Sequence, residues 1–503
     1  MSLSSVLTFL VFSPLLGVLI LGFMPKTQGK ALKAVGFIFT LPSLVLALAV
    51  YFHQLAGKSL SVFSVSKHWI QFGGFEKTDP HLFSVYYELG VNGFTLLLVV
   101  LTAVVSSLAA IAVSLYIKKE WKGYFMLFLI LETGMLGVFT AQNLILFFIF
   151  FEATLVPTFF LTGKWGYYEK EKAAWSFLIY NGLGSAILLI VIMILFARTG
   201  TTNIDALYHF INDPNVQLIA PISKAAKFGL FFALLIAFGI KLPIVPLHSW
   251  QLRMHAQAPI PVVMIHSGIL LKIGAYGLIR FGLGIFPEQF KSVAVLLAIL
   301  GVINLLYGAF LAFVQTEFKL MLAYSSVSHM GIILMGLAAL NVAGIQGAIF
   351  QMISHGLISA LLFFLVGVIY ERTGTTEISS LGGLAKGMPL IGGFLLATAM
   401  GNLGLPGMSG FVSEFSAFLG LFQAMPVIAA VGTLGIIMTA AYMLRAVLAM
   451  TFGQANREFT GVTDLKGREY VPVLVLMLLI VLIGVCPSVL SSPLHATLLG
   501  LGG

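Results

Sequence analysis

Residues 145–161 read ILFFIFFEATLVPTFFL, an apolar run interrupted by one carboxylate, Glu152, and by Pro157. A helix needs about 20 mostly apolar residues to cross the hydrocarbon core of a bilayer, and with its flanks this run is long enough. Charged side chains are rare in such helices because each costs about 3 kcal/mol at the membrane centre on insertion scales. The stretch therefore predicts a membrane-spanning helix in which the acid has a specific role.

The whole chain of 503 residues has the composition of a membrane protein. Hydrophobic residues make up 59% and charged residues 9%, and the mean hydropathy is +1.05, which excludes a soluble core with a polar coat. The single cysteine, Cys486, excludes a disulfide framework, a thiol-rich zinc site and an iron-sulfur cluster held by this chain alone. We expect electron chemistry to take place elsewhere.

Fourteen apolar runs are long enough to span a bilayer. The first lacks a preceding basic segment, so we expect it to remain as a helix. Most lysines and arginines fall after the odd-numbered runs. Since basic residues concentrate on the cytoplasmic side, these connections are predicted to face the cytoplasm and both termini to face outward, and the net charge of +9 does not indicate nucleic-acid binding. The centres of the runs are Leu15, Leu44, Leu101, Leu131, Phe150, Ile187, Leu235, Leu270, Leu300, Met330, Leu357, Met400, Ile436 and Leu478.

Five charged residues fall inside the predicted helices: Glu132, Glu152, Lys241, Lys272 and Glu414. Each could form a structural ion pair between helices. Together, in a chain that otherwise keeps charge out of its apolar runs, they favour proton or ion handling.

Two of the predicted helices, the seventh and the twelfth, are interrupted by proline and glycine. The first reads FGIKLPIVPLHSW over residues 238–250, and the second reads MGNLGLPGMSGFVSEF over residues 400–415. Broken helices at membrane depth are tolerated only where they line protein or a water-filled cavity. Because each break lies next to an ionisable residue, Lys241 or Glu414, we expect both to belong to the functional site.

The two breaks also indicate an internal repeat. Leu242-Pro243 and Leu405-Pro406 are separated by nearly the same number of residues as AYGLIR from Ala275 and AYMLR from Ala441. An odd number of helices lies between equivalent points, so the second unit is predicted to be inverted in the membrane. We therefore expect an all-α polytopic protein with inverted five-helix repeats, helices 4–8 and 9–13. The expected divisions are three N-terminal helices with an outward loop (1–117), the repeats (123–282 and 292–451), and a cytoplasmic loop with a last helix (452–503).

Six motifs together resemble the subunit M family of the bacterial proton-pumping NADH:quinone oxidoreductase, complex I, from about Val91 to Arg445. They are FFIFFEATLVPTFFLTGKWG, FGIKLPIVPLHSW, APIPVVMIHSGILLKIGAYGLIRF, KLMLAYSSVSHMGIILMG, ISHGLISALLFFLVGVIYER and GNLGLPGMSGFVSEF. The family is akin to subunits of cation/proton antiporters. The resemblance implies fourteen helices and a central row of charged residues that passes protons across a bacterial plasma membrane without a bound cofactor.

The same resemblance implies roles for individual residues. Glu152, Lys241, Lys272 and Glu414 match the family's proton-translocating glutamates and lysines, and the glutamate at 414 favours subunit M over sister subunits that look to carry lysine there. His329 and His355 match polar positions on the central axis, and His248 follows the first break. NADH or another donor, flavin, iron-sulfur clusters and quinone are expected in partner subunits of the membrane and peripheral arms, including related antiporter-like subunits.

Alternatives remain open at this point. The chain could belong to a multi-subunit cation/proton antiporter or a membrane-bound hydrogenase, or it could be a scaffold that does not conduct. His266 could bond a neighbouring helix. The spacing of His248, His255 and His266 fits no compact metal-ligand set. In the favoured mechanism, Glu152 supports the charge on Lys241, and weakening that pair releases a proton toward Lys272, His329 and Glu414.

Overall fold

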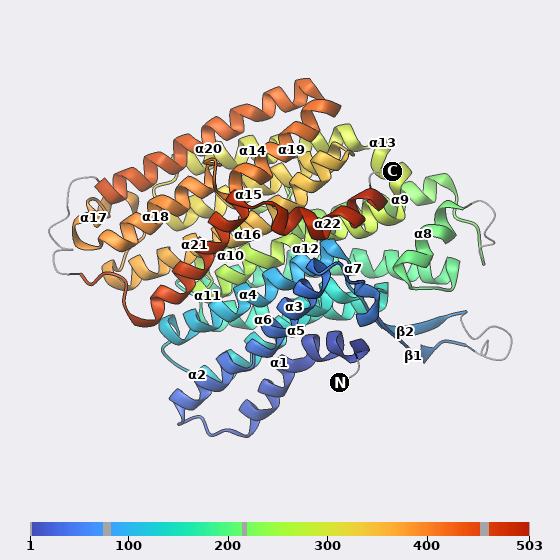
Figure 1. The fold of residues 1–503 in the computed structure, drawn as a ribbon, viewed down its shortest axis with the longest axis horizontal. Helices are drawn as coiled ribbons and strands as arrows, with labels where there is room; N and C mark the ends of the chain where they lie inside the picture. The colour runs from blue at the N-terminus through green and yellow to red at the C-terminus, as the bar shows by residue number, and fades with distance from the viewer. Residues whose placement is uncertain (1–2, 74–81, 214–218, 453–461, 502–503) are drawn as a thin grey trace.

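The computed structural model describes residues 3–73, 82–213, 219–452 and 462–501, and helices dominate it (Figure 1). Among these residues, twelve helices are long and apolar enough to cross a membrane. The two other predicted runs, centred at Leu235 and Met400, are those interrupted by proline and glycine, and each is divided into two helices. The prediction of a polytopic helical membrane protein is therefore confirmed, and every predicted centre lies in a helix.

The N-terminal part combines helices with one small hairpin. Its elements are η1 (Leu3–Ser5), α1 (Val6–Phe23), α2 (Gly29–Ile38), α3 (Leu41–Leu55), η2 (Leu60–Phe63), β1 (Val65–Gln71), β2 (Ser84–Leu89) and α4 (Gly93–Tyr116). The antiparallel strands pair Val65 with Leu89 and Gln71 with Ser84, with an irregularity between His68 and Ile70. The hairpin lies at one end of the bundle (Figure 1).

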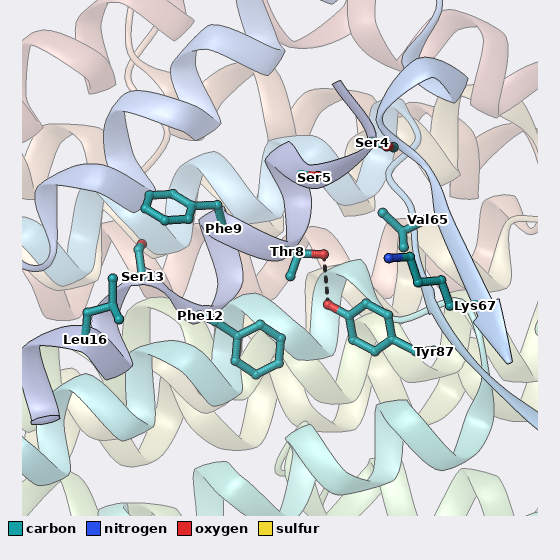
Figure 2. A pocket seen from close by; sticks show the side chains of 10 residues that line it. All are labelled: Ser4, Ser5, Thr8, Phe9, Phe12, Ser13, Leu16, Val65, Lys67 and Tyr87. Carbon is teal, nitrogen blue, oxygen red and sulfur yellow. Dashed lines mark hydrogen bonds between the residues drawn. The ribbon is translucent and has the colours of Figure 1, made fainter. Parts of the chain in front are cut away.

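A pocket of about 430 Å³ separates the hairpin from α1. Figure 2 shows the hydroxyl of Tyr87 on β2 donating to Oγ1 of Thr8 on α1 at 3.0 Å across it. This contact attaches the hairpin to the first helix, away from the central charged residues.

The middle of the chain contains the first broken helix and two π-helical segments, η4 and η5. Its elements are α5 (Trp121–Thr140), α6 (Leu144–Trp165), α7 (Lys170–Thr199), α8 (Ile204–Asn212), α9 (Lys224–Lys241), α10 (Ser249–Gln257), α11 (Ile260–Ile265), η4 (His266–Leu270), α12 (Leu271–Gly277), η5 (Leu278–Leu283) and α13 (Pro287–Ser292). A π segment adds a residue to a helical turn and often marks a functional site.

The last part contains the second broken helix. Its elements are α14 (Ala294–Val314), α15 (Phe318–Ala338), α16 (Val342–Thr373), η6 (Ile378–Ser380), α17 (Leu384–Gly387), α18 (Pro389–Asn402), α19 (Ser409–Ala424), α20 (Pro426–Phe452), η8 (Gly467–Glu469), α21 (Tyr470–Val485) and α22 (Ser488–Leu501). The cytoplasmic loop expected before the last helix begins within residues 453–461, which lie outside the described residues.

The helices that carry Lys272 and His355 are the most enclosed of the candidate spans among the described residues. The most apolar windows of residues 260–283 and of α16 are fully buried, whereas those of α1, α7 and α20 are mostly exposed on the outside of the bundle. Small residues let the central helices approach closely. A Cβ atom on Gly356 of α16 would lie 2.8 Å from the carbonyl oxygen of Gly268 in η4. This close contact places the polar side chains of the two helices within reach of each other.

Two turns on different parts of the chain have the same hydrogen bonds. Residues 198–204 read RTGTTNI and residues 372–378 read RTGTTEI. The first turn binds the start of α6 through Leu144 N and Thr202 O at 2.8 Å, and the second binds the start of α15 through Phe318 N and Thr376 O at 2.8 Å. The turns follow helices that the predicted repeat pairs with each other, while the inverted five-helix repeat as a whole stays a prediction.

Candidate functional site: a buried row of ionisable side chains

In the first helix break, between α9 and α10, a side chain from another helix binds the free backbone groups. Pro243 has no amide hydrogen and cannot continue α9. Asn304 of α14 occupies the gap: its Oδ1 accepts from Val245 N at 2.7 Å, and its Nδ2 donates to Pro243 O at 3.2 Å. The break thus keeps backbone groups satisfied without restoring the helix, and it leaves Lys241 at the end of α9.

The second break, between α18 and α19, uses glycine. Gly404 and Gly407 have φ angles of +79° and +89°, which side-chain-bearing residues rarely adopt. The turn brings the backbone against Glu414, because a Cβ atom on Gly404 would lie 2.8 Å from Oε2 of that residue. Each predicted break therefore stands next to the ionisable residue that the sequence associated with it.

Lys241 is buried against aromatic rings. Its Nζ lies 4.8 Å from the ring centre of Phe151 and 5.6 Å from that of Phe177. Glu152 acts electrostatically on Lys241, but among the described residues neither Lys241 Nζ nor Glu152 Oε1 has a hydrogen-bond partner. The direct pair expected from the sequence is therefore open in this arrangement, and Glu152 is only half-buried.

Lys272 and His355 form the first direct contact of the row. Nζ of Lys272 lies 2.7 Å from Nδ1 of His355 on α16, and it also donates to the carbonyl of Ser267 in η4. Both side chains are buried. A lysine and a histidine joined at this distance can exchange one proton without moving apart.

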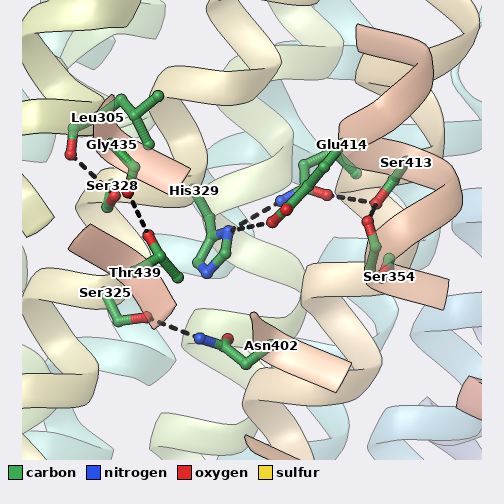
Figure 3. Close-up of polar contacts among 12 residues, drawn as sticks. Leu305, Ser325, Ser328, His329, Ser354, Asn402, Ser413, Glu414, Gly435 and Thr439 are labelled. Carbon is green, nitrogen blue, oxygen red and sulfur yellow. Dashed lines mark hydrogen bonds and ion pairs between the residues drawn. The ribbon is translucent and has the colours of Figure 1, made fainter. Parts of the chain in front are cut away.

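His329 and Glu414 continue the row on the other side of His355. The rings of His355 and His329 have centres 5.4 Å apart, and Nδ1 of His329 lies 3.3 Å from Oε1 of Glu414 (Figure 3). Gln351 and Ser413 support this end: Gln351 Nε2 lies 3.0 Å from His329 Nδ1, and Ser413 donates to Gln351 Oε1 at 2.5 Å. The row thus extends from Lys272 to Glu414.

Three further ionisable residues lie outside these contacts. His248 lies at the first break with its ring 5.0 Å from that of Tyr307, and it has no hydrogen bond to the row. Glu132 is fully buried, and neither carboxylate oxygen has a partner in the described part of the chain. Lys319 is a buried residue in the first turn of α15.

Several contributors were not foreseen. Gln351 and Ser413 carry no charge, so the pattern of charged residues in the sequence does not indicate them. His255 had been considered only as a metal ligand, yet its Nε2 lies 2.9 Å from Nδ1 of His266. Among the described residues, no group of three or more histidine, cysteine, aspartate or glutamate side chains could hold a metal ion.

Comparisons with known proteins identify the family. The family model described as NADH:quinone oxidoreductase/Mrp antiporter, transmembrane, matches residues 141–439, which is more than half of the chain and includes the whole row. The chain belongs to this family. The resemblance to subunit M is also confirmed: NADH-quinone oxidoreductase subunit M of Rhodobacter capsulatus is 35% identical, covering 97% of this chain and 95% of that protein.

Other known proteins are similar over comparable lengths. NAD(P)H-quinone oxidoreductase chain 4 2 of Thermosynechococcus vestitus is 37% identical, covering 98% of this chain and 90% of its own. A chain of respiratory complex I from Thermus thermophilus superposes with a TM-score of 0.86 at 28% identity, over 99% of this chain and all of that one. A chain of the Mrp complex from Dietzia sp. has a TM-score of 0.83 over the full length of both chains, and at 22% identity it shows the shared fold alone.

Proposed function

We propose that this chain is a membrane-arm subunit of a complex I-type NADH:quinone oxidoreductase and that it translocates protons across the membrane. The observation that carries the proposal is the buried contact series Lys272, His355, His329 and Glu414. Ionisable side chains inside a membrane protein are costly in free energy and usually functional, and all four of these are buried.

The proposed proton movement follows the row. Lys241 receives a proton from the cytoplasmic side and holds it when Glu152 is ionised and close, because an opposite charge favours the charged form of an amine. When Glu152 is drawn away, Lys241 passes the proton toward Lys272, and from there it moves through His355 and His329 to Glu414. Release from Glu414 to the outer side completes one passage, and His248 is placed to join as a relay at the first break.

Partner subunits supply the driving reaction in this proposal. NADH or another donor, flavin, iron-sulfur clusters and quinone are bound there, alongside related antiporter-like subunits. The chain lies in a bacterial plasma membrane with both termini outward. We propose the division into an N-terminal unit (1–117), two repeats (123–282 and 292–451) and a C-terminal unit (452–503). An antiporter or hydrogenase subunit remains the alternative. The sequence identities to quinone oxidoreductase subunits, above 30% over nearly the whole chain, favour the first assignment.

The test uses membrane vesicles that contain the whole complex. Glu152→Gln and Lys241→Ala are each expected to abolish proton uptake into inverted vesicles while the assembled complex remains detectable. Proton uptake is followed with a pH-sensitive dye, and quinone reduction is followed in the same sample. Exposed residues provide matched controls, Glu288→Gln and Lys386→Ala. Normal pumping in both test variants would remove the proposal, and purification without quinone-reducing subunits would favour the antiporter or hydrogenase alternative.

A further inference from the structure

A polar pocket opens where the cytoplasmic ends of several central helices meet. It has a volume of about 260 Å³, enough for more than one water molecule. Tyr167, Gln257, Glu317, Lys319 and Thr376 are among the residues that line it. The distribution of lysine and arginine assigns this end of the bundle to the cytoplasm.

Lys319 forms the buried wall of this pocket. Its Nζ donates to the carbonyl of Ala258 at 3.1 Å and lies 4.2 Å from the ring centre of Tyr167. A lysine in the first turn of a membrane helix usually extends to water, whereas this side chain is turned inward and buried. The pocket thus ends on an amine that faces the interior of the bundle.

A chain of hydrogen bonds begins one helical turn beyond Lys319 in α15. Gln251 of α10 donates through Nε2 to the carbonyl of Ala323, one turn beyond Lys319 in α15, at 3.3 Å. The same Nε2 lies 2.7 Å from Nδ1 of His255. His255 in turn lies 2.9 Å from His266, through Nε2 and Nδ1 respectively.

These contacts fix the positions of the hydrogens. Gln251 Nε2 is the donor, so Nδ1 of His255 accepts and its Nε2 carries the hydrogen. Nε2 of His255 therefore donates to Nδ1 of His266, which leaves the hydrogen of His266 on Nε2. Both rings are buried, and Nε2 of His266 has no hydrogen-bond partner in the described part of the chain.

The unpartnered nitrogen of His266 lies in the neighbourhood of Lys241. The ring of Phe177 contacts both residues, with its centre 5.9 Å from that of His266 and 5.6 Å from Nζ of Lys241. Within the described residues, Nζ of Lys241 also lacks a hydrogen-bond partner. Two buried polar atoms without partners beside one ring are the setting in which an ordered water connects protein groups.

We propose that the pocket at Lys319 and the pair His255–His266 form the cytoplasmic proton uptake path of this chain, which delivers protons to Lys241. The inference rests on the proposed function and names the side chains that feed it. In each passage, one proton arrives at Nδ1 of His255 and displaces the amide of Gln251. The proton on Nε2 of His255 moves to Nδ1 of His266, and the proton on Nε2 of His266 leaves through water to a neutral Lys241. One proton enters and one leaves, and rotation of the rings restores the starting tautomers.

The experiment compares substitutions of His266 in vesicles that contain the whole complex. His266→Leu removes both ring nitrogens, whereas His266→Gln can keep the hydrogen bond to His255 but cannot accept and release a proton as imidazole does. Both are expected to lower the number of protons pumped per quinone reduced by about a hundredfold, in line with the loss of one proton-transfer group. His53→Leu, a histidine of α3, is the matched control and is expected to pump normally.

The outcomes separate this inference from the proposed function. Normal pumping in His266→Gln would mean that the histidine only holds its neighbour in place, and it would overturn the uptake path. Lys241→Ala, measured in parallel, tests the proposed function itself: loss of pumping there with normal pumping in the His266 variants defeats the uptake path alone. Should the leucine variant fail to assemble, the glutamine variant and Lys319→Met, expected to slow proton uptake, decide the question.

Discussion

Nζ of Lys272 lies 2.7 Å from Nδ1 of His355, across the contact between α12 and α16. The two residues come from different helices, and their contact joins the lysines near the first break to the acid at the second. Because Gly268 and Gly356 permit the close approach of these helices, the contact depends on small residues as much as on ionisable ones.

Replacing His355 is expected to separate the two ends of the row. His355→Leu removes the imidazole that contacts both Lys272 and His329, so proton pumping should fall by about a hundredfold, a typical effect of losing one acid-base group. The measurement is dye-reported proton uptake normalised to the amount of assembled complex. His209→Leu, in the exposed surface of α8, is the control and should pump normally. Retained pumping in His355→Leu would show that protons bypass α16.

The glycines of the second break offer a paired test of how Glu414 is positioned. Alanine at Gly404 or at Gly407 is strained by the positive φ angle, at a cost of about 1 kcal/mol. Only at Gly404 would the new methyl group meet Glu414, since a Cβ atom on Gly407 has open space around it. We expect both variants to lower thermal stability similarly, while Gly404→Ala alone impairs pumping. Equal pumping in the two variants would show that the turn at Gly404 does not position Glu414 for proton transfer.

The last membrane helix is attached through a buried ion pair. Arg372 of α16 donates to Oε2 of Glu469 at 2.6 Å, and both side chains are about 8% exposed. Glu469→Ala leaves the guanidinium buried without its partner, which costs about 3 kcal/mol. Glu371→Ala removes an exposed partner of Lys118, worth about 0–1 kcal/mol. Thermal unfolding of the purified complex should therefore distinguish the two variants, and similar melting temperatures would contradict the expected role of the buried pair.

The sequence predicted those features that can be recognised from the residue types within a single helix. The apolar runs, both breaks and the intramembrane charges of Lys241, Lys272 and Glu414 are visible because charge, proline and glycine are rare in membrane helices. These features need no knowledge of which helix lies next to which.

Contacts between distant segments could not be predicted in the same way. The bond between His255 and His266 depends on a π segment at residues 266–270, which has no signature in the sequence. Gln351 supports His329 from another helix and looks ordinary in a long apolar run. A lysine near a helix end normally reaches water, and only the packing of Tyr167 and Ala258 shows that Lys319 turns inward.

Asn304 has a consequence for how the chain is made. Its amide satisfies Val245 N and Pro243 O across the first break, and it comes from α14, which is synthesised after the broken helix. Until α14 arrives, those backbone groups must bind water or other polar partners, because an unsatisfied group in hydrocarbon costs several kcal/mol. We therefore expect the segment around Pro243 to settle in the bilayer late in biogenesis, after the ribosome has passed residue 304.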